Sequence, residues 1–391
     1  MMCAVDEKTR DQKIMKTRDQ KIMLESLRKL LKKELQPLLS EMDQKSLFPR
    51  EIYQKLGELG FLGAYYPQEY GGSEVDLLTY FHIIEEIARF DAGFAMSVFA
   101  STVLFGRNVL LHGSEQQKRK YLPRLAKGET VGCWALTEPD AGSDALNIST
   151  RAQKEGDHFL INGSKTFITN APVADHFIVQ TLTAEKKGLK GATAFILERG
   201  MPGLGTGAAF DKMGMRSSPT GEIFMTDLKV HQDQVLGNEN EAFLDMLRSL
   251  DVERSLGASQ ITGLAQACVD ASVRYAKERV QFGQPIANFQ LIRAKLADMA
   301  AGVDMARAYA HHIIAMIEQG KRVTKEAAIL KFFATEMTTR SALEAVQIYG
   351  GYGYTKEFPV ERYVRDAKLF EIGGGTNEIQ RMIVARELLK D

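Results

Sequence analysis

The hydrophobic period of this 391-residue chain changes twice, and these changes limit the folds that it can adopt. From residue 24 to about 130, apolar residues recur at spacings of three and four, which is typical of amphipathic helices. From 131 to 240 there are short β-branched and aromatic runs separated by Gly, Pro, Asn and Asp, which indicate a sheet. From 241 to 391 the helical period returns in long segments, as in a bundle. The sequence therefore predicts a multi-domain α+β protein with an N-terminal helical domain, a central antiparallel β domain and a C-terminal helical bundle.

The long C-terminal segments are expected to be four helices, at 241–277, 287–317, 323–349 and 377–390. In the N-terminal part, Ser114 and Gln117 have the spacing of a capping box at the start of a helix. Strands and helices do not alternate, and no G-x-G-x-x-G follows a strand. A Rossmann dinucleotide site is therefore not expected.

Residues 1–23 stand apart because they contain an octapeptide, KTRDQKIM, at 8–15 and again at 16–23. Two copies are too few for a solenoid, in which stacked repeats bury a continuous core. The segment mixes acidic and basic residues and has no apolar stretch before a cleavage site, unlike a signal or transit peptide. We expect an N-terminal extension, helical or duplicated, that lies outside the core.

Composition argues against several classes of function. Lys and Arg number 50, as do Asp and Glu, so the formal net charge of +0 offers no basic excess for nucleic acid. No apolar run approaches the ~20 residues that cross a bilayer. Cys3, Cys133 and Cys268 fit neither a zinc site nor a disulfide framework, and are expected to be buried small hydrophobes. We therefore expect a cytoplasmic protein without a membrane span.

One carboxylate stands on an otherwise apolar helix face. Steps of three and four from Met246 lead through Leu250, Glu253, Gly257 and Ile261. A carboxylate on a buried stripe is costly unless it is paired or functional, and burial raises its pKa toward that of a base at neutral pH. The next residue, an arginine, lies about 100° around the helix and cannot pair with it on that face. Glu253 is therefore either a catalytic base or half of a salt bridge to another helix.

Two loop segments are candidate ligand sites. WALTEPDAGSD at 134–144 runs from a strand into a turn whose N–H groups and hydroxyls suit a polar ring edge or a phosphate. GGYGY at 350–354 and EIGGGTNEIQR at 371–381 allow close approach of the backbone to a ligand. Thr376 is expected to cap the last helix, whose N-terminus favours anions. From the residues alone, each segment is equally compatible with an ordinary structural turn.

Together these segments resemble the acyl-CoA dehydrogenase family. The resemblance runs from about residue 24 to the end of the chain. It is carried, in the family's order, by LTEPDAGSD, NGSKTFITNA, ERVQFGQPI, LADMA, QIYGGYGY and RDAKLFEIGGGTNEIQR. It implies an N-terminal helical domain, a central β domain and a C-terminal four-helix bundle, usually in a homotetramer. It also implies FAD as cofactor, an acyl-CoA substrate and an electron-transfer flavoprotein as electron acceptor.

By this resemblance, residues from the β domain and the bundle would contact FAD: Trp134, Leu136, Thr137, Phe167, Ile168, Thr169, Arg279, Phe282, Gln347, Gly351, Thr376 and Glu378. Thr137 would lie near the pyrimidine edge of the flavin, and Thr169 within reach of N5. Arg279 and Phe282 would reach the cofactor across a subunit interface. Ser143 and Arg254 match positions that hold the CoA arm.

The chain departs from many family members at the catalytic base. Those members carry a glutamate in Tyr-Glu-Gly-Thr, where this chain has Gly373, Gly374, Gly375 and Thr376. Gly374 cannot be the base, although the resemblance implies that its N–H binds the thioester oxygen. The isovaleryl-CoA and long-chain branches instead place the glutamate on the first long helix of the bundle, where this chain has Glu253. We expect Glu253 to take the α-proton while the β-hydrogen leaves as hydride to the flavin, with no metal required.

The acyl group is predicted from the residues near the base. Gly373 and Gly374 remove bulk beside the reacting carbons, which favours a branched or cyclic acyl group. Ala95 stands where glutaryl-CoA dehydrogenases carry an arginine, which argues against a dicarboxylyl group. Asp91 is either a second carboxylate near the pocket or a helix N-cap. Two alternatives to a dehydrogenase stay open: an oxygen-reactive acyl-CoA oxidase or flavin monooxygenase of the same fold, and a non-catalytic scaffold.

Overall fold

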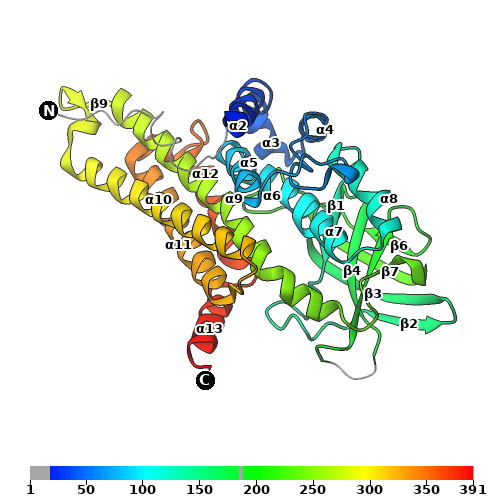
Figure 1. Cartoon of the computed structure of the whole chain (residues 1–391). Coiled ribbons are helices and arrows are strands. Elements are labelled where there is room, and N and C mark those ends of the chain that lie inside the picture. Colours follow the sequence, from blue (N-terminus) through cyan, green and yellow to red (C-terminus); the bar gives the residue numbers. More distant parts are fainter. Residues whose placement is uncertain (1–17, 185–187, 391) are drawn as a thin grey trace.

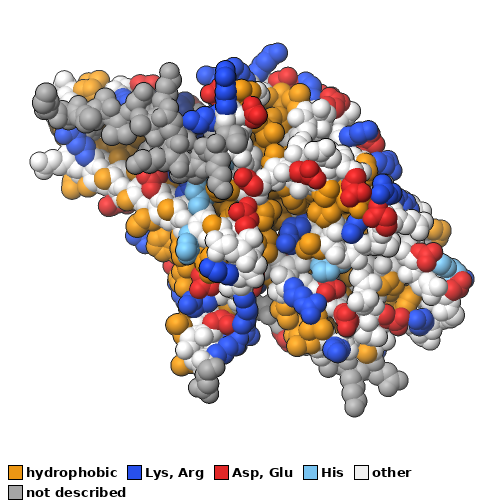
Figure 2. Space-filling model, viewed as in Figure 1, with side chains coloured by type: hydrophobic (Ala, Val, Ile, Leu, Met, Phe, Trp, Pro, Cys, Tyr) orange, Lys and Arg blue, Asp and Glu red, His pale blue; other side chains and the backbone are white. Residues whose placement is uncertain are grey.

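In the computed structural model, three groups of elements follow one another along the chain (Figure 1). The structure describes residues 18–184 and 188–390. Helix α9 (Ala242–Glu278) begins beside the sheet, crosses the N-terminal helices and continues into the bundle. On the face drawn in Figure 2, a notch separates the C-terminal end of the bundle from the β domain. Cys3 and the first octapeptide copy lie outside the described residues.

The N-terminal domain consists of helices, many of them short. They are α2 (Arg18–Leu30), η1 (Leu31–Leu35), η2 (Gln36–Leu38), α3 (Leu39–Lys45), α4 (Arg50–Glu58), η3 (Gln68–Tyr70), α5 (Leu77–Phe90), α6 (Ala92–Phe99), η4 (Ala100–Arg107), α7 (Asn108–His112) and α8 (Glu115–Ala126). The end of the second octapeptide copy is part of α2, where Gln20 Nε2 donates to Thr79 Oγ1 at 2.7 Å. This part of the expected extension therefore packs on the domain instead of lying outside it. The predicted capping box is present at α8, where Ser114 Oγ accepts a hydrogen bond from Gln117 N.

The continuous helix formed by α6, η4 and α7 corrects one sequence expectation. By length and composition, Ala92–His112 is apolar enough to cross a membrane, whereas no run of this kind was expected. Of its most apolar part, 72% is buried inside the protein, as in the core helix of a globular domain. Its eight-residue middle part, η4, is a π-helix, a conformation that is frequent at functional sites.

The central domain is a mostly antiparallel sheet. Its strands are β1 (Gly132–Ala135), β2 (Arg151–Glu155), β3 (His158–Thr169), β4 (His176–Leu182), β5 (Ala192–Glu198), β6 (Leu204–Thr206), β7 (Thr220–His231) and β8 (Val235–Leu236), with a short turn, η5 (Gln232–Gln234), between β7 and β8. The path β6-β7-β3-β2-β4-β5-β8 orders the sheet, and β1 pairs with β4. The β1–β4 pair is parallel, so the sheet is mixed and not wholly antiparallel. Cys133 is buried in the core of this domain, as predicted.

The C-terminal domain is a bundle of long helices. After α9 come the short β9 (Val280–Gln281), β10 (Gln284–Pro285) and η6 (Ile286–Asn288), then α10 (Gln290–Glu318), α11 (Thr324–Tyr349), η7 (Gly350–Tyr354), α12 (Val360–Ile372) and α13 (Asn377–Leu388). The predicted helices correspond to α9, α10, α11 and α13. Helix α12 was not predicted, because its sequence was interpreted as part of a ligand-binding segment. Its apolar residues Val360, Tyr363, Ala367 and Phe370 nevertheless follow helical spacing and are buried.

The crossing of α9 over α5 fixes the bundle to the N-terminal domain. A Cβ on Gly263 would lie 2.4 Å from the Glu85 backbone oxygen, so only glycine allows this close approach. Arg89 of α5 pairs with Asp270 of α9 at 2.6 Å, and Arg307 of α10 pairs with Glu85 at 2.8 Å. The direction of α9, and with it the position of every side chain on its stripe, is therefore set by the N-terminal domain.

A buried ion pair anchors the turn that follows β1. Lys165 Nζ lies 2.8 Å from Glu138 Oε1, with side-chain exposures of 0% and 2%. Burial lowers the pKa of Lys165 to about 8, although the charge of Glu138 opposes this shift. Burial also disfavours ionisation of Glu138, but Lys165 and hydrogen bonds from Ser149 and Thr150 outweigh it and lower the pKa of Glu138 to about 2. Lys165 Nζ also donates to Leu136 O at 3.0 Å, which ties the pair to the backbone of the candidate flavin turn.

We expect Lys165→Met to lower the free energy of unfolding by about 3–5 kcal/mol, because it leaves a buried carboxylate without its counter-ion. Adding Glu138→Gln to that variant should recover at least half of the loss, since no unpaired charge then remains. Denaturant unfolding of the two variants measures both values. A single variant within 1 kcal/mol of the wild type would contradict this account of the turn.

Candidate active site

Glu253 lies on the buried face of α9, where the sequence placed it. The residue is 6% exposed. Burial raises the pKa of Glu253 to about 7, and a hydrogen bond from Asn108 and the charges of Arg107 and Arg254 oppose that rise. A carboxylate with a pKa near neutrality can accept and release a proton at physiological pH.

Among the described residues, the Glu253 carboxylate has a neutral hydrogen-bond donor and no salt-bridge partner. Asn108 Nδ2 donates to Glu253 Oε1 at 2.8 Å. Within residues 18–184 and 188–390, Glu253 forms no ion pair, and Oε2 receives no hydrogen bond. The alternative of a salt bridge to another helix is therefore wrong, and one carboxylate oxygen is left available to another group. Arg254, as expected, points elsewhere, with Nη1 at 4.0 Å from Asp251 Oδ1.

The Gly373–Gly375 turn contacts Arg254, the residue after Glu253. Arg254 Nε approaches Gly374 O at 3.4 Å, so the residue after Glu253 contacts the turn directly. Gly374 has a φ of +67°, and a Cβ there would meet no atom within 4 Å. Among the residues that the structure describes, no acceptor takes the Gly374 N–H. Thr376 caps α13 as predicted, with Oγ1 accepting from Ile379 N at 3.3 Å.

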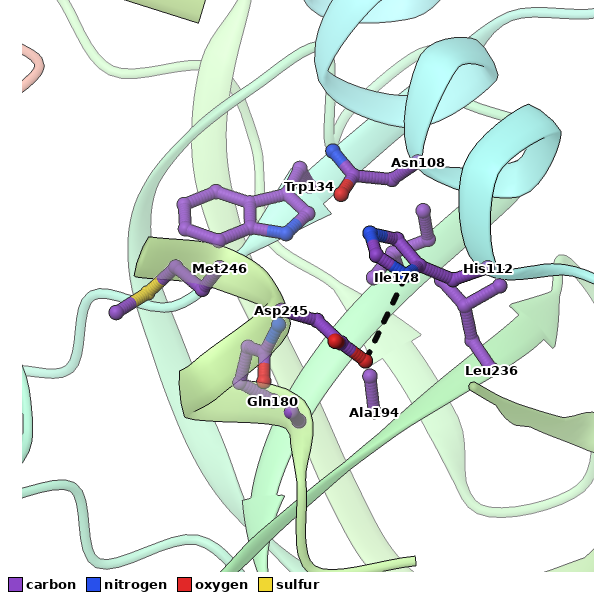
Figure 3. A pocket seen from close by; sticks show the side chains of 10 residues that line it. Asn108, His112, Trp134, Ile178, Gln180, Ala194, Leu236, Asp245 and Met246 are labelled. Carbon is purple, nitrogen blue, oxygen red and sulfur yellow. Dashed lines mark ion pairs between the residues drawn. The ribbon is translucent and has the colours of Figure 1, made fainter. Parts of the chain in front are cut away.

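Strand β1 and the turn after it lie close to helices α7 and α9. Thr137 O accepts from Thr166 N at 2.9 Å, which joins the turn to β3. A small cavity lies between α7, α9 and the sheet, and Figure 3 shows the side chains of Trp134, Asn108 and His112 around it. His112 Nδ1 lies 3.6 Å from Asp245 Oδ2 across this cavity. The Trp134 indole is therefore directed toward the two helices that carry Asn108 and Glu253.

A bulge at the end of β3 shapes the second flavin candidate. The register between β3 and β7 shifts between Lys165 and Ile168. Phe167 has a φ of +57° and is 68% exposed, with its ring 5.4 Å from that of Phe210. Bulges of this kind re-aim side chains next to active sites. The Ile168 side chain instead packs inside the β domain, so only its backbone is available to a ligand beside Thr169.

Four other FAD candidates lie toward the C-terminal end of α9. Arg279 follows the last residue of this 37-residue helix, so it lies roughly 40 Å along the axis from Glu253. The Arg279 guanidinium stacks over the Tyr352 ring at 5.6 Å, beside Gly351, and Phe282 is 92% exposed. Gln347 is near the end of α11, close in sequence to this group. The structure of one chain therefore does not bring the two groups of FAD candidates together.

The substrate candidates are also divided. Ser143 is exposed in the turn after β1, whereas Arg254 and Gly373 lie near Glu253. Ala95 is fully buried in the core of α6. Asp91 caps α6, with Oδ1 accepting from Phe94 N at 2.8 Å.

The other Asp91 contacts complete the N-cap interpretation. Ser217 Oγ donates to Asp91 Oδ1, and Arg362 Nη1 lies 3.3 Å from Asp91 Oδ2. Both carboxylate oxygens are thus occupied at a junction of three domains. Asp91 is a helix cap and an ion-pair partner here, and not a second free carboxylate.

Sequence reasoning missed Asn108 and Arg107. Arg107 Nη1 is buried without a hydrogen-bond partner among the described residues, and its charge acts on Glu253. The signal was an Arg-Asn pair that interrupts an apolar run, but its partner is distant in sequence.

Three family profiles match almost the whole chain. They are the acyl-CoA dehydrogenase N-terminal domain over residues 17–129, the middle domain over 133–228 and the C-terminal domain over 243–389. The chain belongs to the acyl-CoA dehydrogenase family. It is therefore an oxidoreductase of that family, and membership implies FAD as the cofactor.

Acyl-CoA dehydrogenase relatives match over nearly their full lengths. The butyryl-CoA dehydrogenase structure from Megasphaera elsdenii superimposes with a TM-score of 0.93 at 41% identity, covering 96% of this chain and 99% of that chain. Isovaleryl-CoA dehydrogenase of Oryza sativa is 41% identical over 90% of this chain and 86% of its own. The caffeyl-CoA reductase-Etf complex subunit CarC of Acetobacterium woodii is 40% identical over 90% and 92%.

The raised pKa of Glu253 predicts a pH-dependent stability. From an ordinary pKa of 4.5 to about 7, the folded protein keeps a proton that the unfolded chain releases. Stability is therefore lost as pH rises through this window, by up to about 3 kcal/mol. We expect Glu253→Gln to be more stable than the wild type at pH 8 by up to that amount, and nearly equal to it at pH 4.5.

Unfolding free energies of the FAD-loaded proteins at both pH values measure this difference. Glu155→Gln, at an exposed position of β2, is the matched control and should show no such dependence. A Glu253→Gln difference that is the same at both pH values would show that the carboxyl is not held in its neutral form by burial.

Proposed function

We propose that this protein catalyses the α,β-dehydrogenation of an acyl-CoA thioester with Glu253 as the base. The observation that carries this proposal is a buried carboxylate with a pKa of about 7, whose Oε2 receives no hydrogen bond from the described residues. The next residue, Arg254, contacts the carbonyl of Gly374, whose N–H has no acceptor among those residues. Family membership supplies the reaction class, and the position of Glu253 supplies the base that Gly374 lacks.

The residues present fit FAD. The turn after β1 and the bulge at Thr166–Phe167 offer backbone groups to a ligand. Phe167 adds an exposed aromatic ring. At the far end of α9, Gly351 leaves open space where a Cβ would stand, beside the Arg279 guanidinium. When bound, FAD supplies the acceptor for the substrate's β-hydrogen.

We propose the roles of the FAD contacts as follows. Trp134, Leu136, Thr137, Phe167, Ile168 and Thr169 contact the flavin ring. Thr376 and Glu378 belong to the turn that holds the adenylate part. Arg279 and Phe282 contact the FAD diphosphate and adenosine across a subunit interface, and Gln347 and Gly351 make further FAD contacts. Arg279 lies roughly 40 Å along α9 from Glu253, which supports a site shared between subunits, because one chain does not bring both groups to one FAD molecule.

The chain's own residues account for the proton step. The α-proton of a thioester is weakly acidic, so the site must stabilise negative charge that develops on the thioester oxygen. The free Gly374 N–H is suited to donate to that oxygen, and Glu253 Oε2 to remove the α-proton. Burial both raises the basicity of Glu253 and excludes water from the proton transfer. Ser143 and Arg254 are proposed to hold the CoA arm.

The space around the glycine turn supports a branched or cyclic acyl group. A Cβ on Gly374 would meet no atom within 4 Å, and one on Gly373 only ordinary contacts with Leu369. Position 95 carries no arginine for a distal carboxylate. The acyl group is therefore proposed to be uncharged at its far end and wider than a straight chain at its α or β carbon.

The exposed apolar surface of the bundle supports a homo-oligomer, proposed to be a homotetramer. Large apolar side chains are exposed on its helices and on the turn between β9 and β10: Phe282, Leu291, Met305, Leu343, Tyr354 and Met382. Exposed apolar surface is a feature of protein interfaces when such side chains lie together. The name of the A. woodii relative includes an Etf complex, which supports an electron-transfer flavoprotein as the acceptor here.

That relative's name also describes a reductase, and the site is compatible with both directions. A base with a pKa of about 7 is about half protonated at neutral pH, so Glu253 can equally return a proton to the α-carbon. Oxygen uptake during turnover would distinguish an oxygen-reactive oxidase from a dehydrogenase.

The absence of flavin absorption in purified protein would distinguish a non-catalytic scaffold from both enzymes.

We expect Glu253→Gln to lose at least about 10³-fold of kcat across a panel of straight, branched and cyclic acyl-CoAs, because the amide cannot accept the α-proton. Turnover with an artificial electron acceptor and flavin absorbance measure activity and cofactor content separately. Glu155→Gln is the control and should behave as the wild type. Undiminished turnover by Glu253→Gln with bound flavin would exclude Glu253 as the base.

We also expect Gly374→Glu to restore part of the activity when it is added to Glu253→Gln, mainly on straight-chain substrates. The open space at Gly374 admits the side chain, although φ of +67° costs about 1–2 kcal/mol for any residue other than glycine. The same acyl-CoA panel measures the recovery and its preference. Recovery on branched substrates alone would contradict the proposed geometry.

A further inference from the structure

Asn108 is the single side chain that contacts the carboxylate of Glu253 by a hydrogen bond within the described parts of the chain. It is buried and is the first residue of α7, directly after the π-helix η4. Asn108 N bonds to Phe105 O, whereas the side-chain Nδ2 donates to Leu104 O at 2.8 Å. The amide therefore satisfies a carbonyl of the irregular turn that precedes it.

The two hydrogens of Asn108 Nδ2 have two different acceptors. One is the Leu104 carbonyl and the other is Glu253 Oε1, each at 2.8 Å. Because both partners are acceptors, they determine which end of the amide is the nitrogen. The hydrogen bond to Leu104 O thus fixes the plane of the Asn108 amide. The second hydrogen bond of Nδ2 then fixes Oε1 of the Glu253 carboxylate. Glu253 Oε2 is left without a donor among the described residues.

We propose that Asn108 is a positioning residue that fixes the Glu253 carboxylate for proton transfer. This inference rests on the proposed function, in which Glu253 is the base. A neutral donor suits this role because it orients the carboxylate without the full charge of an ion pair. The ion pair of Glu138 with Lys165 illustrates the alternative, since its carboxyl has a pKa of about 2 and would be a poor base.

Other charged and titratable groups face Glu253 from each neighbouring element. Arg107 of η4 and Arg254 of α9 lower its pKa, after burial and the Asn108 hydrogen bond. Tyr65, whose pKa is raised chiefly by burial, also interacts with its charge. His112 lies one turn after Asn108 but pairs with Asp245, and burial lowers its pKa. These groups remain in place when Asn108 is replaced, so the change in Glu253 can be assigned to the lost hydrogen bond.

The test is the pH dependence of kcat/KM and kcat for the FAD-loaded enzyme, in Asn108→Leu and in the isosteric Asn108→Asp. Loss of a hydrogen bond to a charged group shifts the pKa of that group by about one to two units. Here the loss disfavours the carboxylate, so the acidic limb of the profile should move up by about one to two pH units. Because Glu253 is about half ionised at pH 7 in the wild type, activity should fall about 5- to 50-fold at pH 7 and return toward the wild-type value above pH 9.

Asn108→Asp retains the size of the side chain and places a second carboxylate beside Glu253, so its limb should move at least as far as that of Asn108→Leu. Asn108→Gln retains a donor, so its acidic limb should lie closer to that of the wild type than the limb of Asn108→Leu does. Leu111→Ala, at an exposed position of the same short helix, is the control for damage to α7 and should leave the profile unchanged. Flavin absorbance confirms cofactor content in each variant.

The outcomes separate this inference from the proposed function. If Glu253→Gln is inactive and the acidic limb of both Asn108→Leu and Asn108→Asp stays at its wild-type pH, Asn108 has no positioning role. An equal loss of activity at every pH would also overturn the inference, because it indicates general structural damage. If Glu253→Gln is active, the proposed base itself fails. If Asn108→Leu does not fold, the limb of Asn108→Asp decides alone.

Discussion

The site depends on a buried carboxylate whose single hydrogen-bond partner, among the residues that the structure describes, is neutral. The same chain contains the opposite arrangement at Glu138, where a buried lysine lies 2.8 Å away and the pKa is about 2. At Glu253 the partner is the Asn108 amide, and burial raises the pKa to about 7. Two buried glutamates thus differ in role because their partners differ in charge. One stabilises a turn as a permanent anion, and the other can exchange a proton near neutral pH.

Each domain contributes a different part of this environment. The N-terminal helices supply Asn108 and, through the close approach at Gly263, determine where α9 lies. The bundle supplies α9 itself and the turn at Gly374, which Arg254 contacts. The β domain supplies the turn after β1 and the bulge at the end of β3. The hydrogen bond from Asn108 to Glu253 joins two of these domains, so the proposed base has its partner only when they are docked.

The length of α9 has a consequence for assembly. The flavin candidates of the β domain lie near its first half, whereas Arg279 follows its last residue, roughly 40 Å along the helix from Glu253. A neighbouring subunit would bridge this separation, and the exposed apolar side chains of the bundle offer a surface for it. Catalysis and oligomerisation would then be coupled, because each cofactor would be held by two chains.

The sequence by itself determined the order of the domains, the long helices of the bundle and the buried face on which Glu253 lies, because hydrophobic period is a local property that survives without a structure. It also identified Gly374 as a position without a base. It did not reveal Asn108, which is 145 residues from Glu253 along the chain. It left Asp91 as either a helix N-cap or a second carboxylate, and only the structure shows the cap at Phe94 and the ion pair with Arg362. Nor did it reveal helix α12 or the parallel β1–β4 pair. Those features arise only when elements dock, since a periodic pattern shows which face of a helix is buried but not which side chain it meets there.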